Sequence, residues 1–315
     1  MAESYNTLAG LVQFNDKNLA DLIITDLLDE SPLMKVLHAQ VASNGTEHKY
    51  LKQTTASSAA FRAALAGLAK TSSADTLVTD TLAIIDGSFD TDVALANSYK
   101  GGKDAWLQME LARTMKQIMF ELESQVIYGV GNDAAGFPGL HDNAQLNAVA
   151  DAMCFACATP GSSATSQTSV YLLRHGANAC SFVIGNNGNF VVEEEPTVIM
   201  RTPNPDSAPT LHYPAYYVPV TGYGGFQIGG AYDAARICNI ETALDDDDIA
   251  NGLALFPSAR QCNLIVMNRK AFNLIRKSRT ATNPTGAPAP YFTECFGIPV
   301  VVTDAVVSTE AVVAA

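Results

Sequence analysis

The most regular apolar pattern of the chain runs through residues 103–127, where apolar side chains return every three or four positions. This spacing places them on one face of an α-helix, and we predict that Gly129 and Gly131 end it. At about 1.5 Å per residue, the helix would be roughly 40 Å long. The apolar stripe consists of Leu107, Leu111, Met115, Ile118, Leu122 and Val126.

The first part of the chain carries a shorter helical pattern. Asp16 is placed as an N-cap, and apolar residues at helical spacing follow it at positions 19–27. Ser31 and Pro32 mark the start of a second helix, because proline suits the first helical position. Two short helices without a partner segment predict an N-terminal arm that packs on another body.

Residues 46–96 predict an unusually long hairpin. The stretch 46–54 is polar and extended in character, and residues 76–96 are rich in Thr, Val, Ile and Phe, with Gly87 as a bulge or kink. The residues between them, 54–75, are mostly small. An isolated hairpin is marginally stable and exposes strand edges, so we expect a partner subunit to cover it.

The middle of the chain predicts mainly short strands. Residues 137–165 have the character of a loop with a small helix, and residues 166–240 contain short β-runs broken by turns. The turn signals in this region are Asn187-Gly188, Gly224-Gly225 and Gly229-Gly230.

The last quarter of the chain mixes both kinds of element. The acidic run 245–248 caps a helix expected to end at Leu255, because carboxylates favour helix N-termini. Residues 263–268 predict a buried strand, 269–279 a basic helix and 297–305 a final strand. Helices and strands do not alternate regularly and no repeat is visible, so the fold class is α+β.

The composition implies extensive contacts with other chains. Charged residues make up 16% of the 315 positions, against about 25% in an average soluble protein. The longest uncharged stretch, 152–173, contains Pro160 and Gly161 with many hydroxyl side chains, which argues against a membrane span. No signal peptide is visible, so we expect a soluble protein made in the cytoplasm, with no membrane partner.

The net charge of −13 argues against a nucleic-acid-binding module, which would need a basic stripe to neutralise phosphates. The basic helix at 269–279 is the local exception. We expect it to pair with an acidic face of a neighbouring subunit, in preference to nucleic acid.

The cysteines favour buried thiols over a disulfide framework or a metal site. Cys154 and Cys157 form a C-x-x-C pair, but no second pair follows and the nearest histidine, His175, stands alone, whereas a zinc site needs four ligands. The remaining cysteines are scattered at Cys180, Cys238, Cys262 and Cys295.

No catalytic template fits the sequence. The glycines of 129–136 follow a helix where a dinucleotide site needs a strand, and 100–104 lacks the residues of a phosphate loop. The acidic run 245–248 does not match a calcium loop, and neither H-E-x-x-H nor G-x-S-x-G occurs. The dispersed histidines are His38, His48, His141, His175 and His212. We therefore expect no catalytic, cofactor-binding or metal-binding residues and no enzyme activity.

The order of the predicted parts resembles the tailed-bacteriophage major capsid proteins of the Hong Kong 97 type. Several stretches add to this resemblance, which covers nearly the whole chain. They are "YNTLAGLVQFNDKNLADLI" at 5–23, "SNGTEHKYLK" at 43–52, "YGVGNDAAGFPGL" at 128–140, "FPSARQCNLIVMNRKAFNLIRKSRTATNPTGAPAP" at 256–290 and "GIPVVVTDA" at 297–305.

The resemblance implies a division of the chain into four parts. Residues 1–43 would form the N-terminal arm and 44–96 the extended loop with its strands, reaching over a neighbouring subunit. Residues 97–146 and 280–315 would form the peripheral domain with the spine helix, and 147–279 the axial domain around the five-fold and six-fold axes.

The resemblance also implies partners and a location. The subunit would assemble with itself into the pentamers and hexamers of an icosahedral virion capsid, in the cytoplasm of a host bacterium, around DNA bound without sequence specificity. Portal and cement proteins would be further partners. Since no long segment precedes the arm, scaffolding would come from a separate protein or be absent.

Two other functions remain open at this point. An encapsulin-like nanocompartment would share the fold and differ in its contents. A soluble α+β enzyme would assemble its active site from residues far apart in the sequence. Particles visible by electron microscopy would separate both shell proteins from the enzyme.

Overall fold

The computed structural model describes residues 30–188, 191–192, 197–202, 212–283 and 287–314. The helix expected over residues 16–27 lies outside the described residues. The described chain forms two compact units. The first is drawn from Ile84–Leu122 and Asn189–Gly222, and the second from Pro32–Ala83, Glu123–Gly188 and Tyr223–Ala315.

The second unit is built on a mixed six-stranded sheet. The strands β7, β13 and β14 are buried at every position, which explains why their sequences are nearly continuous apolar runs. β14 is parallel to β16 and antiparallel to β7. The order is β15 (Glu294–Cys295), β16 (Ile298–Val302), β14 (Leu264–Met267), β7 (Thr168–Leu173), β13 (Ala234–Ile240) and β6 (Cys154–Ala156).

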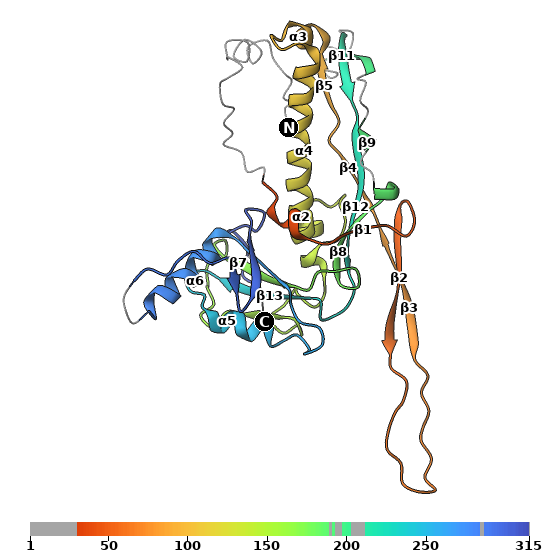
Figure 1. Cartoon of the computed structure of the whole chain (residues 1–315), viewed down its shortest axis with the longest axis vertical. Coiled ribbons are helices and arrows are strands. Elements are labelled where there is room, and N and C mark those ends of the chain that lie inside the picture. Colours follow the sequence, from red (N-terminus) through yellow and green to blue (C-terminus); the bar gives the residue numbers. More distant parts are fainter. Residues whose placement is uncertain (1–29, 189–190, 193–196, 203–211, 284–286, 315) are drawn as a thin grey trace. The chain divides into compact units, whose positions relative to one another are not determined.

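Two helices pack on this sheet (Figure 1). Helix α5 (Asp246–Leu253) contacts β13, and α6 (Arg269–Ala281) contacts β7 through a buried face that includes Phe272 and Ile275. Both helices confirm the sequence prediction. α5 ends two residues before the predicted Leu255.

A five-stranded sheet lies beside the hairpin base, in the order β1-β8-β12-β4, with β9 also paired to β12. The Gly224-Gly225 pair was expected to mark a bend but lies inside β12, where a Cβ on Gly225 would come within 2.5 Å of Leu82. The strands are β1 (Ala39–Val41), β4 (Ala83–Asp86), β8 (Cys180–Ile184), β9 (Val191–Val192) and β12 (Val220–Ile228).

The turn signal at Asn187-Gly188 also has a different role from the one expected. It lies in the short 3-10 helix Asn186–Gly188, with Gly188 at φ 84°. The flanking strands β8 and β9 do not form a hairpin, because each pairs with β12.

The long hairpin is present, but its second strand ends at Thr81, because residues 83–86 and 89–92 of the expected run pair in other sheets. β2 (Glu47–Thr55) and β3 (Ala74–Thr81) pair in antiparallel register, with Leu51 opposite Leu77, and residues 56–73 connect them (Figure 1). Its base is fixed by a hydrogen bond of 2.7 Å between His48 Nε2 and Gln227 Oε1. We call β2, β3 and residues 56–73 the hairpin, and residues 56–73 its tip.

The first unit combines the sheet β10-β11-β5 with helix α3 and most of α4. Residues 93–96 were expected to continue a strand but belong to α3, because the Asp92 side chain accepts a hydrogen bond from the Ala94 N–H and caps that helix. The elements are β5 (Phe89–Asp92), α3 (Val93–Ser98), β10 (Thr197–Arg201) and β11 (Tyr213–Val218).

The predicted long helix is α4 (Lys103–Tyr128), within one residue of the expected end. In the first unit, Trp106 is buried near its start and donates a hydrogen bond of 3.2 Å to Thr91 Oγ1. Gly87 separates β4 from β5, and a Cβ there would collide with Ile118 of the apolar stripe.

Gly129 ends α4 in the second unit, as predicted. It adopts φ 53°, and a Cβ at this position would overlap the Asp142 carboxylate and the Gly139 backbone nitrogen. The same carboxylate accepts hydrogen bonds from the N–H groups of Val130 and Gly139. The first glycine after the long helix is therefore required by both conformation and space.

Candidate functional site

The C-x-x-C cysteines lie among buried thiols. All six cysteines are free and buried. The Cys154 Sγ lies 3.8 Å from the Cys238 Sγ, while Cys157 donates to the backbone oxygens of Thr159 and Asn239. Within the described part of the chain, His, Cys, Asp and Glu side chains do not gather into a group that could hold a metal ion.

The acidic run forms a helix cap, as predicted. The Asp245 side chain accepts a hydrogen bond of 3.0 Å from the Asp248 N–H, and the Asp248 carboxylate accepts one of 3.3 Å from the Asp245 N–H. Asp246 makes a bidentate ion pair with Arg279, with distances of 2.8 and 2.6 Å.

Three side chains of the basic helix find partners in the same chain, and its expected pairing with a neighbouring subunit stays a prediction. Arg279 holds Asp246, Lys270 donates to the Ser166 carbonyl and Arg276 donates to the Ala289 carbonyl.

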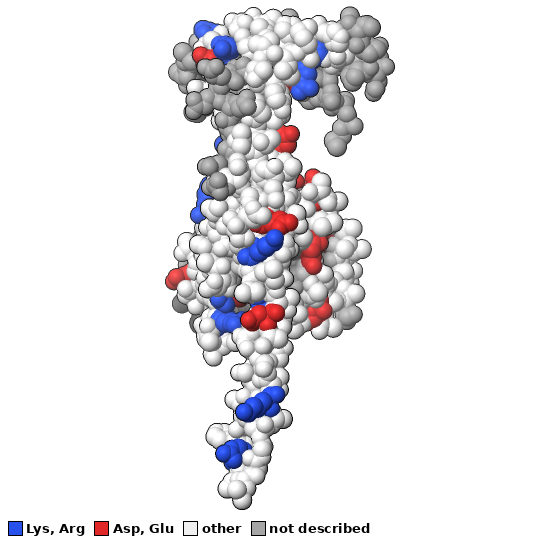
Figure 2. All heavy atoms as spheres, turned by 90° about the vertical axis from the view of Figure 1, so that its right-hand side faces the viewer, with Lys and Arg blue, Asp and Glu red and all other residues white. Residues whose placement is uncertain are grey.

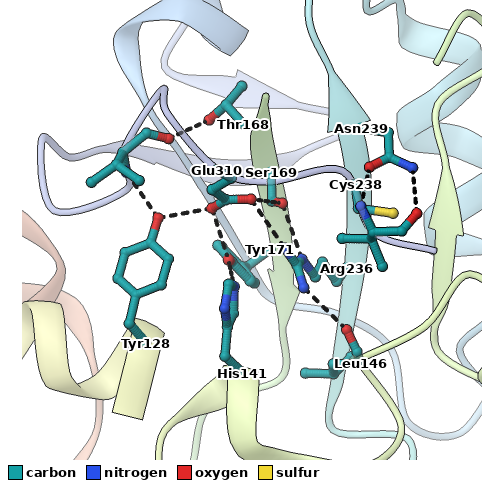
Figure 3. A network of polar contacts seen from close by, with 12 residues as sticks. Tyr128, His141, Leu146, Thr168, Ser169, Tyr171, Arg236, Cys238, Asn239 and Glu310 are labelled. Carbon is teal, nitrogen blue, oxygen red and sulfur yellow. Dashed lines mark hydrogen bonds and ion pairs between the residues drawn. The ribbon is translucent and has the colours of Figure 1, made fainter. Parts of the chain in front are cut away.

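An extensive polar cluster surrounds Arg236 of β13 in the second unit. Its guanidinium lies 3.0 Å from the Glu310 carboxylate, and both side chains are 5% exposed. The Arg236 Nε donates to the Ser169 hydroxyl at 3.0 Å, and Nη1 donates to the Leu146 carbonyl at 3.3 Å. The Ser169 hydroxyl donates to Glu310 at 2.5 Å, so the buried ion pair is also hydrogen-bonded (Figure 3).

Aromatic side chains complete this cluster from other elements. The Tyr128 hydroxyl, at the end of α4, donates to Glu310 Oε1 at 2.8 Å and accepts a hydrogen bond from the Val307 N–H. The Tyr171 hydroxyl of β7 lies 3.4 Å from the same carboxylate oxygen and shares a hydrogen bond of 2.5 Å with His141 Nε2 (Figure 3). We call these residues, with Arg236, Ser169 and Glu310, the Arg236 network.

Burial fixes the protonation states of the Arg236 network. Burial, reinforced by the Glu310 carboxylate, raises the pKa of Tyr128 and of Tyr171 well above the usual range of a phenol. Burial and the charge of Arg236 lower the pKa of His141 to about 3. The phenols and the imidazole are therefore neutral at pH 7, and the charge of the cluster is carried by Arg236 and Glu310.

The Arg236 network attaches the C-terminal segment, residues 305–314, to the six-stranded sheet. Glu310 also forms a two-way backbone bridge with Gln167, and the Asn239 side chain bonds both backbone groups of Val313 at 3.0 and 2.8 Å. Two cavities, of about 380 and 330 Å³, are lined by other side chains. The geometry therefore supports a structural role for this cluster.

Sequence reasoning missed the Arg236 network, although a signal was present. Arg236 is the single charged residue of β13, and Glu310 is the single charged residue of the last eleven positions. A lone cation and a lone anion in apolar surroundings are the residues that burial would bring together.

The hairpin is the second candidate site, and its character is the opposite. Apolar side chains are open to solvent along it, with Phe61 at 107% and Leu65 at 104% exposure, and Leu51 and Leu77 are also exposed. Residues 49–74 contain four basic residues, Lys49, Lys52, Arg62 and Lys70, and no acidic one. On the face drawn in Figure 2, only basic charged side chains are visible over the lower end, which is the tip.

An exposed surface of apolar and basic side chains is suited to binding another macromolecule. Among the described residues, no helix combines the length and the apolar character needed to cross a bilayer.

Comparison of the sequence with protein families finds one match over most of the chain. Residues 15–314 match the family model described as major capsid protein GP7. No match was found among curated proteins.

Comparison of structures points in the same direction. The chain is similar to the protein of bacteriophage Epsilon15, with a TM-score of 0.70 and 17% identity, over 99% of this chain and 98% of that one. The JBD30 bacteriophage capsid matches with a TM-score of 0.51 and 10% identity, over 96% and 99%. The similarity to the encapsulin complex of Synechococcus elongatus is weaker, with a TM-score of 0.45 and 13% identity over 76% and 97%. The shared fold is the α+β tailed-phage capsid fold of the Hong Kong 97 type.

Proposed function

The chain belongs to the family of the major capsid protein GP7, and we propose that it builds the pentamers and hexamers of its shell through the hairpin. As a member of this family with the tailed-phage capsid fold, it is a structural protein of the virion, where it self-assembles into the shell around the phage genome. The exposed apolar side chains of the hairpin are the observation that carries the proposal.

The physical argument for the hairpin rests on unburied apolar area. Burying a side chain such as Phe or Leu is worth about 1.5–3 kcal/mol, and Phe61 and Leu65 gain none of this in the isolated chain. A neighbouring subunit that covers the tip would recover that free energy at every copy of the contact. Many such contacts of moderate strength close a shell through multivalency.

We propose the following domain assignment within the shell. Residues 1–43 form the arm, 44–96 the extended loop, 97–146 with 280–315 the peripheral domain, and 147–279 the axial domain. In this assignment β16 of the peripheral domain pairs with β14 of the axial domain, so the six-stranded sheet joins the two domains.

We propose further that the chain has no catalytic role. The Arg236 network supports this, because its imidazole and phenols are held neutral by burial and its ion pair is fully hydrogen-bonded inside the protein. These groups do not line either of the two cavities described above, and the phenols and the imidazole are not poised to exchange a proton near pH 7.

The partners and the place of assembly are also proposals. The net charge of −13 supports a container that encloses DNA without binding a particular sequence. Assembly takes place in the cytoplasm of the host bacterium, with a portal, cement proteins and a separate scaffolding protein as candidate partners.

Deletion of residues 55–74 tests the role of the hairpin. We expect a folded subunit with an unchanged circular dichroism spectrum and cooperative thermal unfolding, because the deleted tip is exposed and outside the core. We expect no closed particles by electron microscopy or light scattering, under conditions in which the wild type assembles. Normal closed particles from the deleted chain would contradict the proposal. The variant Phe61→Ser/Leu65→Ser keeps the full length of the hairpin. It therefore separates the effect of losing apolar contacts from the effect of shortening the hairpin.

A further inference from the structure

The hairpin tip has the sequence of an amphipathic helix, although it is extended in the free chain. Phe61, Leu65 and Leu68 are spaced by four and three residues, which would place them within about 60° of one another around a helix. Arg62 and Lys70 would fall outside this arc. Six of the twelve residues from 59 to 70 are alanine, the best helix former, and Gly67 is the only poor one.

The extended tip also carries local strain. Leu65 adopts φ 64°, in the left-handed region, within a turn closed by a hydrogen bond of 3.1 Å from the Ala66 N–H to the Ala63 carbonyl. This conformation costs a residue with a side chain about 1–2 kcal/mol. A right-handed helix would remove the strain and could turn Phe61 and Leu65 toward a common surface.

The charge of the tip indicates which partner its apolar side chains would contact. Residues 49–74 are purely basic among charged residues, whereas the whole chain carries −13, so the remainder of the chain is strongly acidic. A second copy of this chain therefore presents the complementary charge.

We propose that residues 59–70 fold into an amphipathic helix when the tip docks on a second copy of this chain. Phe61, Leu65 and Leu68 then bury against the neighbour, and Arg62 and Lys70 face its carboxylates. This inference rests on the proposed role of the hairpin in assembly and adds the conformation in which the tip binds.

The hairpin has room for this change. A helix of twelve residues is about 18 Å long, and the spacers 56–58 and 71–73 reach about 10 Å each. The cost is the loss of the Ser58–Thr71 pair, which holds the free tip with hydrogen bonds of 2.9 and 2.8 Å. Because both bonds are exposed to water, their net contribution is small.

Two substitutions separate a helical from an extended bound tip. Ala64→Pro suits the free turn, since proline favours the position before a turn residue with positive φ, but it is incompatible with a helix interior. Gly67→Ala has open space around the new Cβ in the free chain and favours a helix by about 1 kcal/mol. We expect Ala64→Pro to abolish assembly, and Gly67→Ala to lower the concentration for half-maximal assembly roughly fivefold.

The matched controls lie outside the proposed helix. Ser57→Pro introduces the same residue into the spacer, and Gly45→Ala fills another glycine with open space around it. Both should assemble like the wild type. Circular dichroism and thermal unfolding of the unassembled subunits establish that all four variants are folded.

Hydrogen exchange gives an independent readout. Amides 63–70 should exchange freely in the subunit and become protected in wild-type shells. Wild-type assembly by Ala64→Pro together with no effect of Gly67→Ala would overturn the inference. If the deletion of 55–74 still abolished shells, the proposed function would stand without the helix, whereas closed shells from that deletion would overturn both.

A basic amphipathic segment can also bind anionic lipid. Co-sedimentation of the full chain with phosphatidylserine-containing vesicles distinguishes this possibility. Vesicle binding that needs Phe61 and Leu65, combined with normal assembly of Ala64→Pro, would assign the helix to a lipid surface and overturn docking on a second copy.

Discussion

At the scale of single residues, Arg236 is held by a carboxylate supplied 74 positions later in the chain. A buried ion pair adds little net stability, because desolvation of the two charges offsets most of their attraction. Removal of one partner has a much larger effect, since the other charge stays buried and unpaired. Removal of Glu310 should therefore cost more stability than the ion pair contributes, because it would leave Arg236 buried without its carboxylate partner.

Substitution of Glu310 tests this asymmetry. We expect Glu310→Ala to lower the free energy of unfolding of the unassembled subunit by about 3–5 kcal/mol, measured by urea denaturation. Asp304→Ala, in the same part of the chain but exposed, should change it by less than about 0.5 kcal/mol. The double variant Arg236→Met/Glu310→Leu should recover most of the loss. Equal effects of Glu310→Ala and Asp304→Ala would show that the ion pair is dispensable.

At the scale of elements, the start of α5 and the last turn of α6 are joined by Asp246 and Arg279. The hydrogen bonds from Arg279 lower the pKa of the Asp246 carboxyl below its usual value. A carboxyl with a lowered pKa binds its proton less tightly in the folded chain than in the unfolded one. Its contribution to stability is therefore complete above the unfolded pKa, near 4, and is lost as the pH falls through the folded value.

We accordingly expect Asp246→Asn to reduce the melting temperature at pH 7, and to reduce it less as the pH falls through the folded pKa of Asp246, because the wild-type carboxyl then takes up a proton itself. Both side chains are about one-third exposed, so the effect should be modest, under about 1 kcal/mol. Differential scanning calorimetry from pH 2 to pH 7 measures it. Asp247→Asn, an exposed neighbour in the same acidic turn, is the control. A loss of stability by Asp246→Asn that is the same at both pH values would refute the linkage.

Elements with a strong local period could be predicted from the sequence, and those decided by tertiary pairing could not. The apolar stripe of α4 and the continuous apolar run of β14 each predict their element from the local sequence alone. Strands β1 and β6 have three residues each, and their partners are far along the chain, so nothing local marks them. Residues 93–96 directly follow a β-rich run, but the cap by Asp92 and the helix-forming Ala and Leu residues decide for helix.

The candidate sites divide in the same way. The hairpin could be predicted because its composition changes abruptly at the small residues of 54–75. The Arg236 network could not, because it unites residues from five separate segments of the chain. A lone charge in an apolar run indicates that a partner exists but does not identify it.

At the scale of the whole molecule, charge is distributed unevenly. The tip region is basic and the rest of the chain is acidic, so copies of the subunit repel each other overall while the tip is attracted to a neighbour. Screening by salt weakens both interactions over a length of about 10 Å at 0.1 M. Comparison of variants at one salt concentration separates the local attraction of the tip from the overall repulsion between subunits.

We expect Arg62→Glu/Lys70→Glu to assemble about tenfold more slowly than the wild type at low salt, because local attraction becomes repulsion. The ratio of the two rates should approach one at about 0.5 M salt. Time-resolved light scattering measures both rates. The control, Lys277→Glu, reverses an exposed charge on α6 and should follow the wild type more closely. A rate ratio that does not change with salt would argue against electrostatic guidance by the tip.

The attachment of the C-terminal segment also has a consequence for protein synthesis. Strands β7 and β13 leave the ribosome long before residue 310, so Arg236 has no carboxylate partner until 74 further residues have been translated. A chain cut short by premature termination would keep an uncompensated charge in its core and fold poorly. Such fragments would be left to cellular proteases and kept out of the particle. The ion pair would thus act as quality control, admitting to the shell only subunits whose translation has passed residue 310.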